Sequence, residues 1–191
     1  MVSVGPYNKI TDMQQMWNIP DLRGPAPEIV YPPKSLMGII ANHPELKAVC
    51  KMIKQANMDG RLADEQANLT VFLPSDVYVN ERYPEGYVSR MGEGLAKRVL
   101  GASMLNRQID RETMRSVVRG LFPCVDRSSH IQAFSTPCGC TCLNDLVMVK
   151  TWDIHASNGI LHLCDGLLLP RTAWSDITGT CANQTCNGKV V

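Results

Sequence analysis

The sequence has almost no net charge. Nineteen Lys and Arg residues stand against eighteen Asp and Glu residues, so the formal net charge of the 191-residue chain is +1 at pH 7. Proteins that bind nucleic acid or an acidic membrane surface usually concentrate positive charge, because phosphate contacts are largely electrostatic. The charge balance therefore argues against nucleic acid as a partner and favours other proteins.

Long apolar segments are also missing. The longest nearly apolar run, residues 160–170, is about half of the roughly 20 residues that cross a bilayer, and it contains His162 and Asp165. Residues 1–33 hold six prolines and lack the apolar stretch of a secretory signal. We expect no transmembrane segment, and either a signal that was removed before residue 1 or no export by that route.

Motifs of catalysis are absent as well. The sequence contains no GxSxG, HExxH, GxGxxG or P-loop pattern, and its four histidines are scattered. Scattered histidines and aspartates do not define a nucleophile, a base and an orienting acid. We therefore predict a protein that is not an enzyme and that carries no cofactor.

The chain that remains is typical of a globular protein, with 45% hydrophobic and 19% charged residues. Its length suits one well-buried core and is short for two. Residues 1–34 are predicted to form an extended proline-rich arm, because repeated prolines disfavour regular structure. Residues 35–170 are predicted to form the folded domain, and residues 171–191 a polar tail that contains cysteines.

Hydrophobic periodicity within residues 35–170 indicates a mixture of helices and strands. Ser35 can cap a short helix, and Leu46, Val49, Cys50 and Ile53 follow at the spacing of one helix face. Further helices are predicted at 95–100 and at 110–118, the latter capped by Asp110 and closed by Gly120. Strands are predicted at 69–73, 104–109, 131–134, 146–152 and 160–164. The fold class is therefore α+β.

A tight turn is predicted between the last two strands. Ser157, Asn158 and Gly159 lie between them, and Asn-Gly is the favoured pair where both turn residues need a positive φ. We predict a β-hairpin with positive φ at Asn158 and Gly159.

Two segments resemble the signatures of fasciclin domains. Residues 69–76 read LTVFLPSD, similar to a strand of the form TVFAPTD that leads into a helix. Residues 153–170 read DIHASNGILHLCDGLLLP, similar to the family's second signature. The resemblance covers roughly residues 35–170. It implies a fasciclin-like α+β wedge of two small β-sheets that meet at an angle, with helices packed on one side, and a role in adhesion or in the extracellular matrix.

The resemblance also bears on individual residues. A Tyr-His pair of adhesive members is replaced here by Ala102 and Ser103, which implies that this adhesive element is lost. Asp153 and Ile154 coincide with an Asp-Ile pair that some extracellular members use to engage integrins, so they are candidate partner-binding residues. The alternative is a strand-end aspartate beside a core isoleucine. His162 lies in an apolar strand without a set of partners, so we predict a structural role for it.

Eight cysteines leave three possibilities open, namely disulfides, a metal site and free thiols. Side chains two apart in a strand share a face, so three thiols near residue 140 could lie together, and a tail pair could bridge to them. Thiolates suit zinc, although structural zinc sites usually use CxxC rather than CxCxC spacing. Cys50 and Cys164 lie in apolar patterns and are expected to be free and buried. The disulfide or metal candidates are Cys124, Cys138, Cys140, Cys142, Cys181 and Cys186.

Two functions are compatible with these observations. The first is a structural subunit of a large assembly, such as a minor capsid or cement protein in the virion of a large virus, whose arm and tail clasp other protein subunits. The second is an extracellular or cell-surface adhesion domain. The proline-punctuated arm and the dense cysteines favour the first.

Overall fold

The computed structural model describes residues 30–88, 90–136 and 140–170. Most of the predicted arm and all of the predicted tail lie outside these residues. Contacts along the chain mark the start of one compact unit at Tyr31, and the fold below is that of the described part of this unit.

Helices and strands both contribute to the unit. The helices are α1 (Leu36–Asn42), α2 (Lys47–Gln55), α3 (Asp59–Ala63), α4 (Asp76–Arg82), α5 (Glu93–Ala102) and α6 (Arg111–Ser116). The strands are β1 (Leu69–Pro74), β2 (Met104–Leu105), β3 (Arg119–Pro123), β4 (His130–Ser135), β5 (Thr141–Leu143), β6 (Val147–Ala156) and β7 (Gly159–Cys164). The α+β class predicted from the sequence is confirmed.

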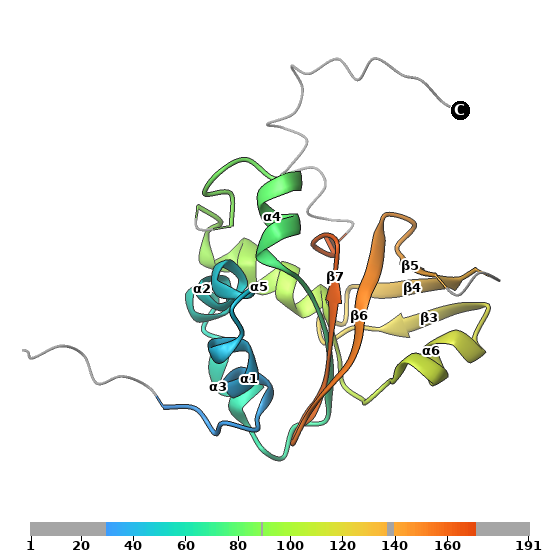
Figure 1. The fold of residues 1–191 in the computed structure, drawn as a ribbon, viewed down its shortest axis with the longest axis horizontal. Coiled ribbons are helices and arrows are strands. Elements are labelled where there is room, and N and C mark those ends of the chain that lie inside the picture. Colours follow the sequence, from blue (N-terminus) through green and yellow to red (C-terminus); the bar gives the residue numbers. More distant parts are fainter. Residues whose placement is uncertain (1–29, 89, 137–139, 171–191) are drawn as a thin grey trace, which may run out of the picture. The chain divides into compact units, whose positions relative to one another are not determined.

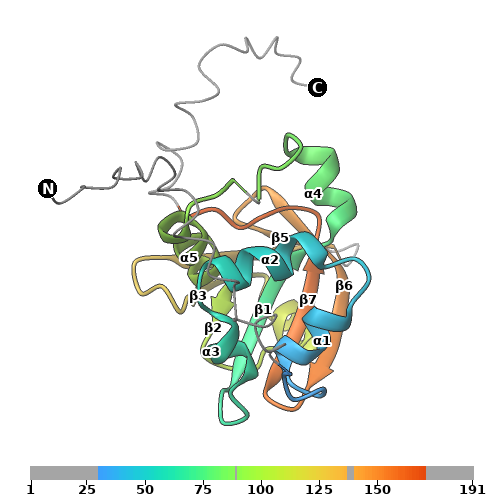
Figure 2. The same ribbon diagram turned by 90° about the vertical axis from the view of Figure 1, so that its left-hand side faces the viewer.

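The strands follow the order β2-β1-β7-β6-β5-β4-β3 (Figures 1 and 2). β1 and β7 run parallel, and the other neighbouring strands in this order are antiparallel. The long strand β6 pairs with β7 on one side and β5 on the other, and its register with β7 shifts twice between Val149 and Ile154. Such irregularities bend and twist a strand. β6 therefore joins a β2–β1–β7 part of the sheet to a β5–β4–β3 part.

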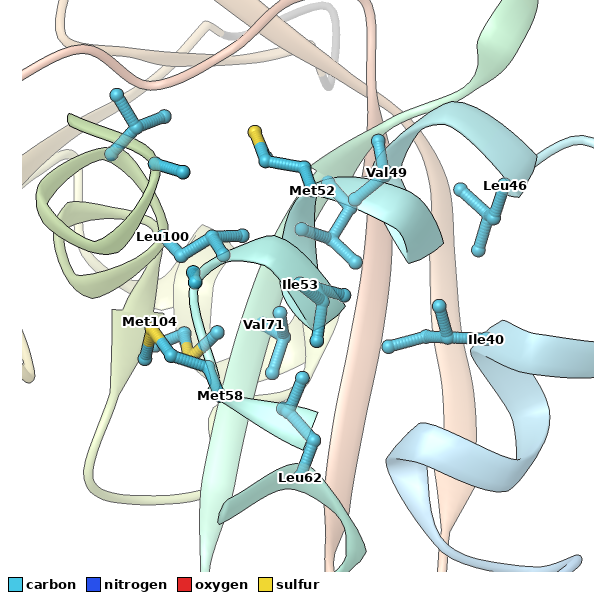
Figure 3. Packing of buried hydrophobic residues seen from close by; sticks show 14 of the residues in the cluster. Ile40, Leu46, Val49, Met52, Ile53, Met58, Leu62, Val71, Leu100 and Met104 are labelled. Atoms are coloured by element: carbon cyan, nitrogen blue, oxygen red, sulfur yellow. The ribbon is translucent and has the colours of Figure 1, made fainter. Parts of the chain in front are cut away.

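Helices α1 to α5 lie on the side of β1 and β7, whereas α6 lies beside the β3–β4 part (Figures 1 and 2). The larger core fills the space between these five helices and the strands, and Figure 3 shows Ile40, Ile53 and Val71 pointing into it. A second core on the β3–β5 side includes Phe72 and Phe122. Consecutive residues of β1 thus enter different cores, which explains why this strand is apolar throughout rather than alternating.

Some helices are capped by the residue just before them, and one is capped by a residue distant in the sequence. The Ser35 hydroxyl accepts a hydrogen bond from the Gly38 N–H at the start of α1, as predicted, and Asp110 accepts one from Thr113 at the start of α6. Helix α2 has no side-chain cap of its own. Instead, the Asp76 carboxylate accepts hydrogen bonds from the first two N–H groups of α2, at 2.9 and 3.0 Å.

Two predicted boundaries are wrong. The helix predicted to reach residue 118 ends at Ser116, and Gly120 lies inside β3, where alternate residues are buried against the second core. The strand predicted over 104–109 is paired only at Met104 and Leu105. Beyond these residues the Thr70 hydroxyl donates to the carbonyl of Arg107 and accepts from the N–H of Ile109, which holds the chain without a ladder.

The predicted hairpin between β6 and β7 is confirmed, but its predicted turn conformation is wrong. Ala156 pairs with Gly159, so Ser157 and Asn158 form the turn, and neither Asn158 nor Gly159 has a positive φ. The pair of positive φ values, 52° and 61°, occurs instead at Asn144 and Asp145 between β5 and β6. Asn and Asp are the non-glycine residues that tolerate this conformation best.

Candidate interaction surface

Asp153, a predicted partner-binding residue, lies at a bulge of β6. Its backbone has a φ of 57°, and it lies in the stretch between Thr151 and Ile154 where the register between β6 and β7 shifts. Its carboxylate accepts a hydrogen bond of 2.9 Å from the N–H of Arg111, the first residue of α6. The side chain is 31% exposed. Asp153 therefore anchors α6 to the sheet and leaves only part of its carboxylate open to solvent.

The neighbouring His162 is fully buried and has a structural role. The N–H of Asp153 donates to Nδ1 of His162 at 3.1 Å, so Nε2 carries the proton and lies 2.9 Å from the carbonyl of Ile109. The ring also packs between Phe72 and Trp152, with ring centroids 5.1 and 4.9 Å away. Burial lowers the pKa of His162, and the hydrogen bond to Ile109 opposes that shift. The geometry is that of a neutral imidazole engaged at both nitrogens.

Ile154, the second predicted partner-binding residue, is half-buried and packs against the larger core. Only the exposed part of the Ile154 side chain is therefore available for contact with a partner. The structure places Asp153 and Ile154 next to each other along β6, but each also has a role within the domain. A partner contact by this pair remains a prediction.

Three substitutions of Asp153 separate its structural role from a partner contact. Asp153→Asn keeps an acceptor for Arg111 and tolerates positive φ, so the free energy of unfolding should change by less than about 0.5 kcal/mol. Asp153→Gly removes the acceptor alone and should cost about 1 kcal/mol. Asp153→Ala also strains the backbone and should cost about 2 kcal/mol or more. Urea unfolding measures all three; unchanged stability of Asp153→Ala would contradict the structural role.

A second candidate surface is the outward side of β3 and β4, which we call the outer face. In β3, Gly120 and Phe122 point to the second core, whereas Leu121 is 66% exposed. In β4, Phe134 is 37% exposed, whereas Ala133 before it is buried. Leu121 pairs with Gln132, two residues from Phe134, so Leu121 and Phe134 are diagonal neighbours on this face. The exposed polar residues around them are Arg119 and His130.

The outer face continues into β5 and β6. Phe134 pairs with Cys142, and Cys142 pairs in turn with Met148. Both residues are half-buried. This row of Phe, Cys and Met side chains is apolar and polarizable, as protein-binding surfaces often are.

A pocket of about 850 Å³ adjoins the outer face. Its walls come from β3 and β4, from the turn between β5 and β6, from the end of α4 and from residues 167–170. Leu121 and Leu146, which is 56% exposed, contribute apolar surface, whereas His130, Gln132 and Asn144 contribute hydrogen-bonding groups. No sequence pattern predicts this pocket, because its walls are far apart along the chain.

The last wall of the pocket is held in place by α4. The N–H of Leu167 donates to the hydroxyl of Tyr83 at 3.1 Å. The buried carboxylate of Asp165 lies 2.9 Å from the guanidinium of Arg82 and accepts a hydrogen bond from the N–H of Met148. These contacts fix the segment that ends at Pro170.

The cysteines do not assemble as predicted within the described residues. Cys50, Cys124, Cys140, Cys142 and Cys164 are all free thiols. Cys124 is buried in the second core and donates toward the carbonyl of Ala102, so it does not join the segment around Cys140. Burial raises the pKa of Cys124 to about 12 and also raises the pKa of Cys142. Cys138, Cys181 and Cys186 lie outside the described residues.

Cys140 is exposed and lies just before β5, and Cys142 is half-buried within that strand. That the two thiols lie together stays a prediction. Cys164 is buried and Cys50 half-buried, and burial raises the pKa of both thiols. No group of three His, Cys, Asp or Glu side chains among the described residues could hold a metal ion. Nor is any helix in these residues long and apolar enough to cross a membrane.

Comparisons with known proteins give one family and one fold. A family model described as the Fasciclin domain matches residues 44–170. A solved structure of a FAS1 domain pair from the insect cell adhesion molecule Fasciclin I is similar over 74% of this chain, with a TM-score of 0.61 and 19% sequence identity. This chain covers 52% of that one and so spans about half of its length. No curated protein matches the sequence.

Proposed function

Because the chain belongs to the fasciclin domain family, we propose that it is a non-enzymatic protein-interaction module that serves as a structural subunit of a larger protein assembly. Fasciclin domains act in protein–protein contact and adhesion. The observation that carries the proposal is the outer face, where Leu121 and Phe134 lie exposed beside each other. An apolar centre with a polar rim is the usual anatomy of a protein interface.

The composition of the outer face supports contact through the face rather than through the strand edge. β3 ends the strand order, so its outer edge has no neighbouring strand from the described residues along most of its length. Pro123 and Arg119 lie on this edge strand, and proline and charged residues discourage the addition of another strand. Fully burying an exposed Leu or Phe side chain contributes roughly 1.5–3 kcal/mol.

The remaining parts of the chain fit the same proposal. Residues 1–34 and 171–191 would hold neighbouring subunits, and the sequence favours the virion of a large virus as the assembly, with this chain as a minor capsid or cement protein. These two points rest on the sequence alone.

Adhesion is the second candidate function. Fasciclin domains are typically extracellular or on the cell surface, and the similar solved structure belongs to a cell adhesion molecule. The exposed part of the Asp153 side chain, 31% of it, would then contact a receptor. The two functions differ in the partner: a fixed set of subunits in one, a cell surface in the other.

The proposal is tested by cross-linking and mass spectrometry on the tagged full-length protein in its native source. Leu121→Asp and Phe134→Thr should weaken the cross-linked complexes at least about tenfold, because they remove the anchors of the interface. Val118→Asp is the matched control, since Val118 is 71% exposed but lies outside the strand. Complexes that survive both substitutions as well as the control would contradict the proposal. Loss of binding to intact cells alone would favour adhesion.

A further inference from the structure

The turn between β6 and β7 carries a chemically labile dipeptide, Asn158-Gly159. Because Gly159 has no side chain, its backbone nitrogen can reach Cγ of Asn158 when the chain is free to rotate. Attack forms a bond between this nitrogen and Cγ, breaks the bond between Cγ and Nδ2, and releases ammonia with the proton of the Gly159 N–H. Water then opens the cyclic imide at either carbonyl and leaves aspartate or isoaspartate at position 158. The reaction needs no reactant besides water.

The folded domain holds the Asn158 side chain away from this path. Asn158 is only 1% exposed. Its Oδ1 accepts a hydrogen bond from the N–H of Leu36 at 2.8 Å, and its Nδ2 donates to the carbonyls of Leu62 and Asp64 at 3.0 and 2.7 Å. Ring closure requires the side chain to turn toward Gly159, so these three bonds must break before the reaction can begin.

The attacking nitrogen is held as well. Gly159 pairs with Leu69 in the parallel ladder and with Ala156 in the hairpin. The carbonyl of Asn158 accepts a hydrogen bond from the N–H of Leu69 at 3.2 Å. This carbonyl and the Gly159 nitrogen belong to the same planar peptide group, so the pairing fixes the direction of the nitrogen.

The blocking contacts come from helices that are distant in sequence. Leu36 is the first residue of α1, whereas Leu62 and Asp64 lie at the end of α3. The residue before the pair is also tied to the start of α1, because the N–H of Ser157 donates to the carbonyl of Lys34 at 2.8 Å. The reactivity of the turn therefore depends on whether α1 and α3 are docked against it.

We propose that Asn158-Gly159 is a latent self-modification site, blocked while α1 and α3 are docked and reactive when they separate from the turn. Modification prevents the helices from docking again. Aspartate directs a carboxylate oxygen toward the carbonyls of Leu62 and Asp64, and isoaspartate adds a methylene group to the backbone of a turn between paired strands. The site thus limits how long the domain can stay open and still recover. None of these residues belongs to the outer face, so the inference is independent of the proposed interface.

The test uses the full-length protein with Asn187→Gln, which removes the second Asn-Gly pair of the sequence. Samples are incubated at neutral pH with a reductant, folded or in urea, and peptide mapping by mass spectrometry measures aspartate and isoaspartate at position 158. Modification should be at least about a hundredfold slower in the folded protein, because the native domain opens rarely. After urea is removed, size-exclusion chromatography should place unmodified molecules in the compact fraction and modified molecules in the expanded fraction.

Two cap variants test the role of α1. Ser35 caps α1 beside the turn, whereas Asp110 caps α6. Ser35→Ala should speed modification of the folded protein at least about fivefold, because loss of the cap favours separation of α1. Asp110→Ala should leave the rate within about twofold although it also lowers global stability, because α6 does not contact the turn residues.

Three results overturn the proposal. Equal rates in the folded protein and in urea would mean that the contacts of Asn158 give no protection. Equal acceleration by Ser35→Ala and Asp110→Ala, in proportion to their losses of global stability, would mean that only complete unfolding exposes the pair. Modified molecules that return to the compact fraction would mean that the reaction does not trap the open domain.

Discussion

Asn158→Ala should lower the free energy of unfolding by about 4 kcal/mol, a large part of the total stability of a domain of this size. The Asn158 side chain is buried and makes three hydrogen bonds to backbone groups. Its Oδ1 accepts from the N–H of Leu36, and its Nδ2 donates to the carbonyls of Leu62 and Asp64, at 2.8, 3.0 and 2.7 Å. Alanine removes a buried partner from the N–H of Leu36 and from the carbonyl of Leu62, each at a cost of roughly 1–3 kcal/mol. The carbonyl of Asp64 keeps its hydrogen bond from the N–H of Ala67.

Two further variants sharpen this experiment, with urea unfolding as the measurement. Asn158→Asp keeps the size and the acceptor for Leu36 but directs a carboxylate oxygen toward two carbonyls, so it should be no more stable than Asn158→Ala. Asn68→Ala changes an exposed asparagine and should shift stability by less than about 0.5 kcal/mol. If Asn158→Asp restored native stability, the two bonds donated by Nδ2 would be unimportant.

Gly159→Ala should lower the free energy of unfolding by about 3 kcal/mol or more. Gly159 pairs with Leu69 in the parallel ladder of β1 and β7. A Cβ atom at Gly159 would overlap the carbonyl oxygen of Leu69 and would come within 2.8 Å of Cδ1 of Leu36. The backbone oxygen cannot rotate away, so the strands or α1 must separate.

Gly94→Ala is the matched control for this substitution. Gly94 lies in α5, a Cβ there would meet no atom within 4 Å, and alanine should stabilise the domain by roughly 0.5–1 kcal/mol. Thermal or urea unfolding measures both variants. Gly159 has no positive φ, so backbone strain adds nothing to the expected loss. A loss of only about 1 kcal/mol for Gly159→Ala would therefore contradict the steric explanation.

The elements that the sequence predicted well are those whose signals are local. Ser35 and Asp110 cap helices with their own side chains. The apolar runs of β1 and β7 can be recognised as buried strands from the sequence alone, without knowledge of the strands they pair with. Strand β3 was missed because it contains Gly120 and Pro123, which normally interrupt strands. Its pairing with β4 imposes the conformation. The cap of α2 could not be predicted from the residues around α2, because Asp76 lies 29 residues from Lys47 and 28 from Ala48.

The candidate surfaces were harder to predict for the same reason. Asp153 and Ile154 came from a resemblance, and their hydrogen bonds and packing with distant residues could not be known from the sequence. In the sequence, Leu121 is one apolar residue among several. Its exposure follows only from the structure, because residues of β3 alternate between the second core and the outer face. Cys124 was grouped with other cysteines by type, although packing places it in the second core.

The parallel pairing of β1 with β7 has a consequence for how the domain forms during synthesis. β1 lies between β2 and β7, and its partner β7 is the last strand of the described chain. Asn158 likewise joins α1 across 122 positions of sequence. Contacts this distant give a high contact order and slow folding, because a long loop must close before they form. The α1–α3 helices therefore leave the ribosome well before the strand that completes their core, and in that interval their apolar faces are open to chaperones.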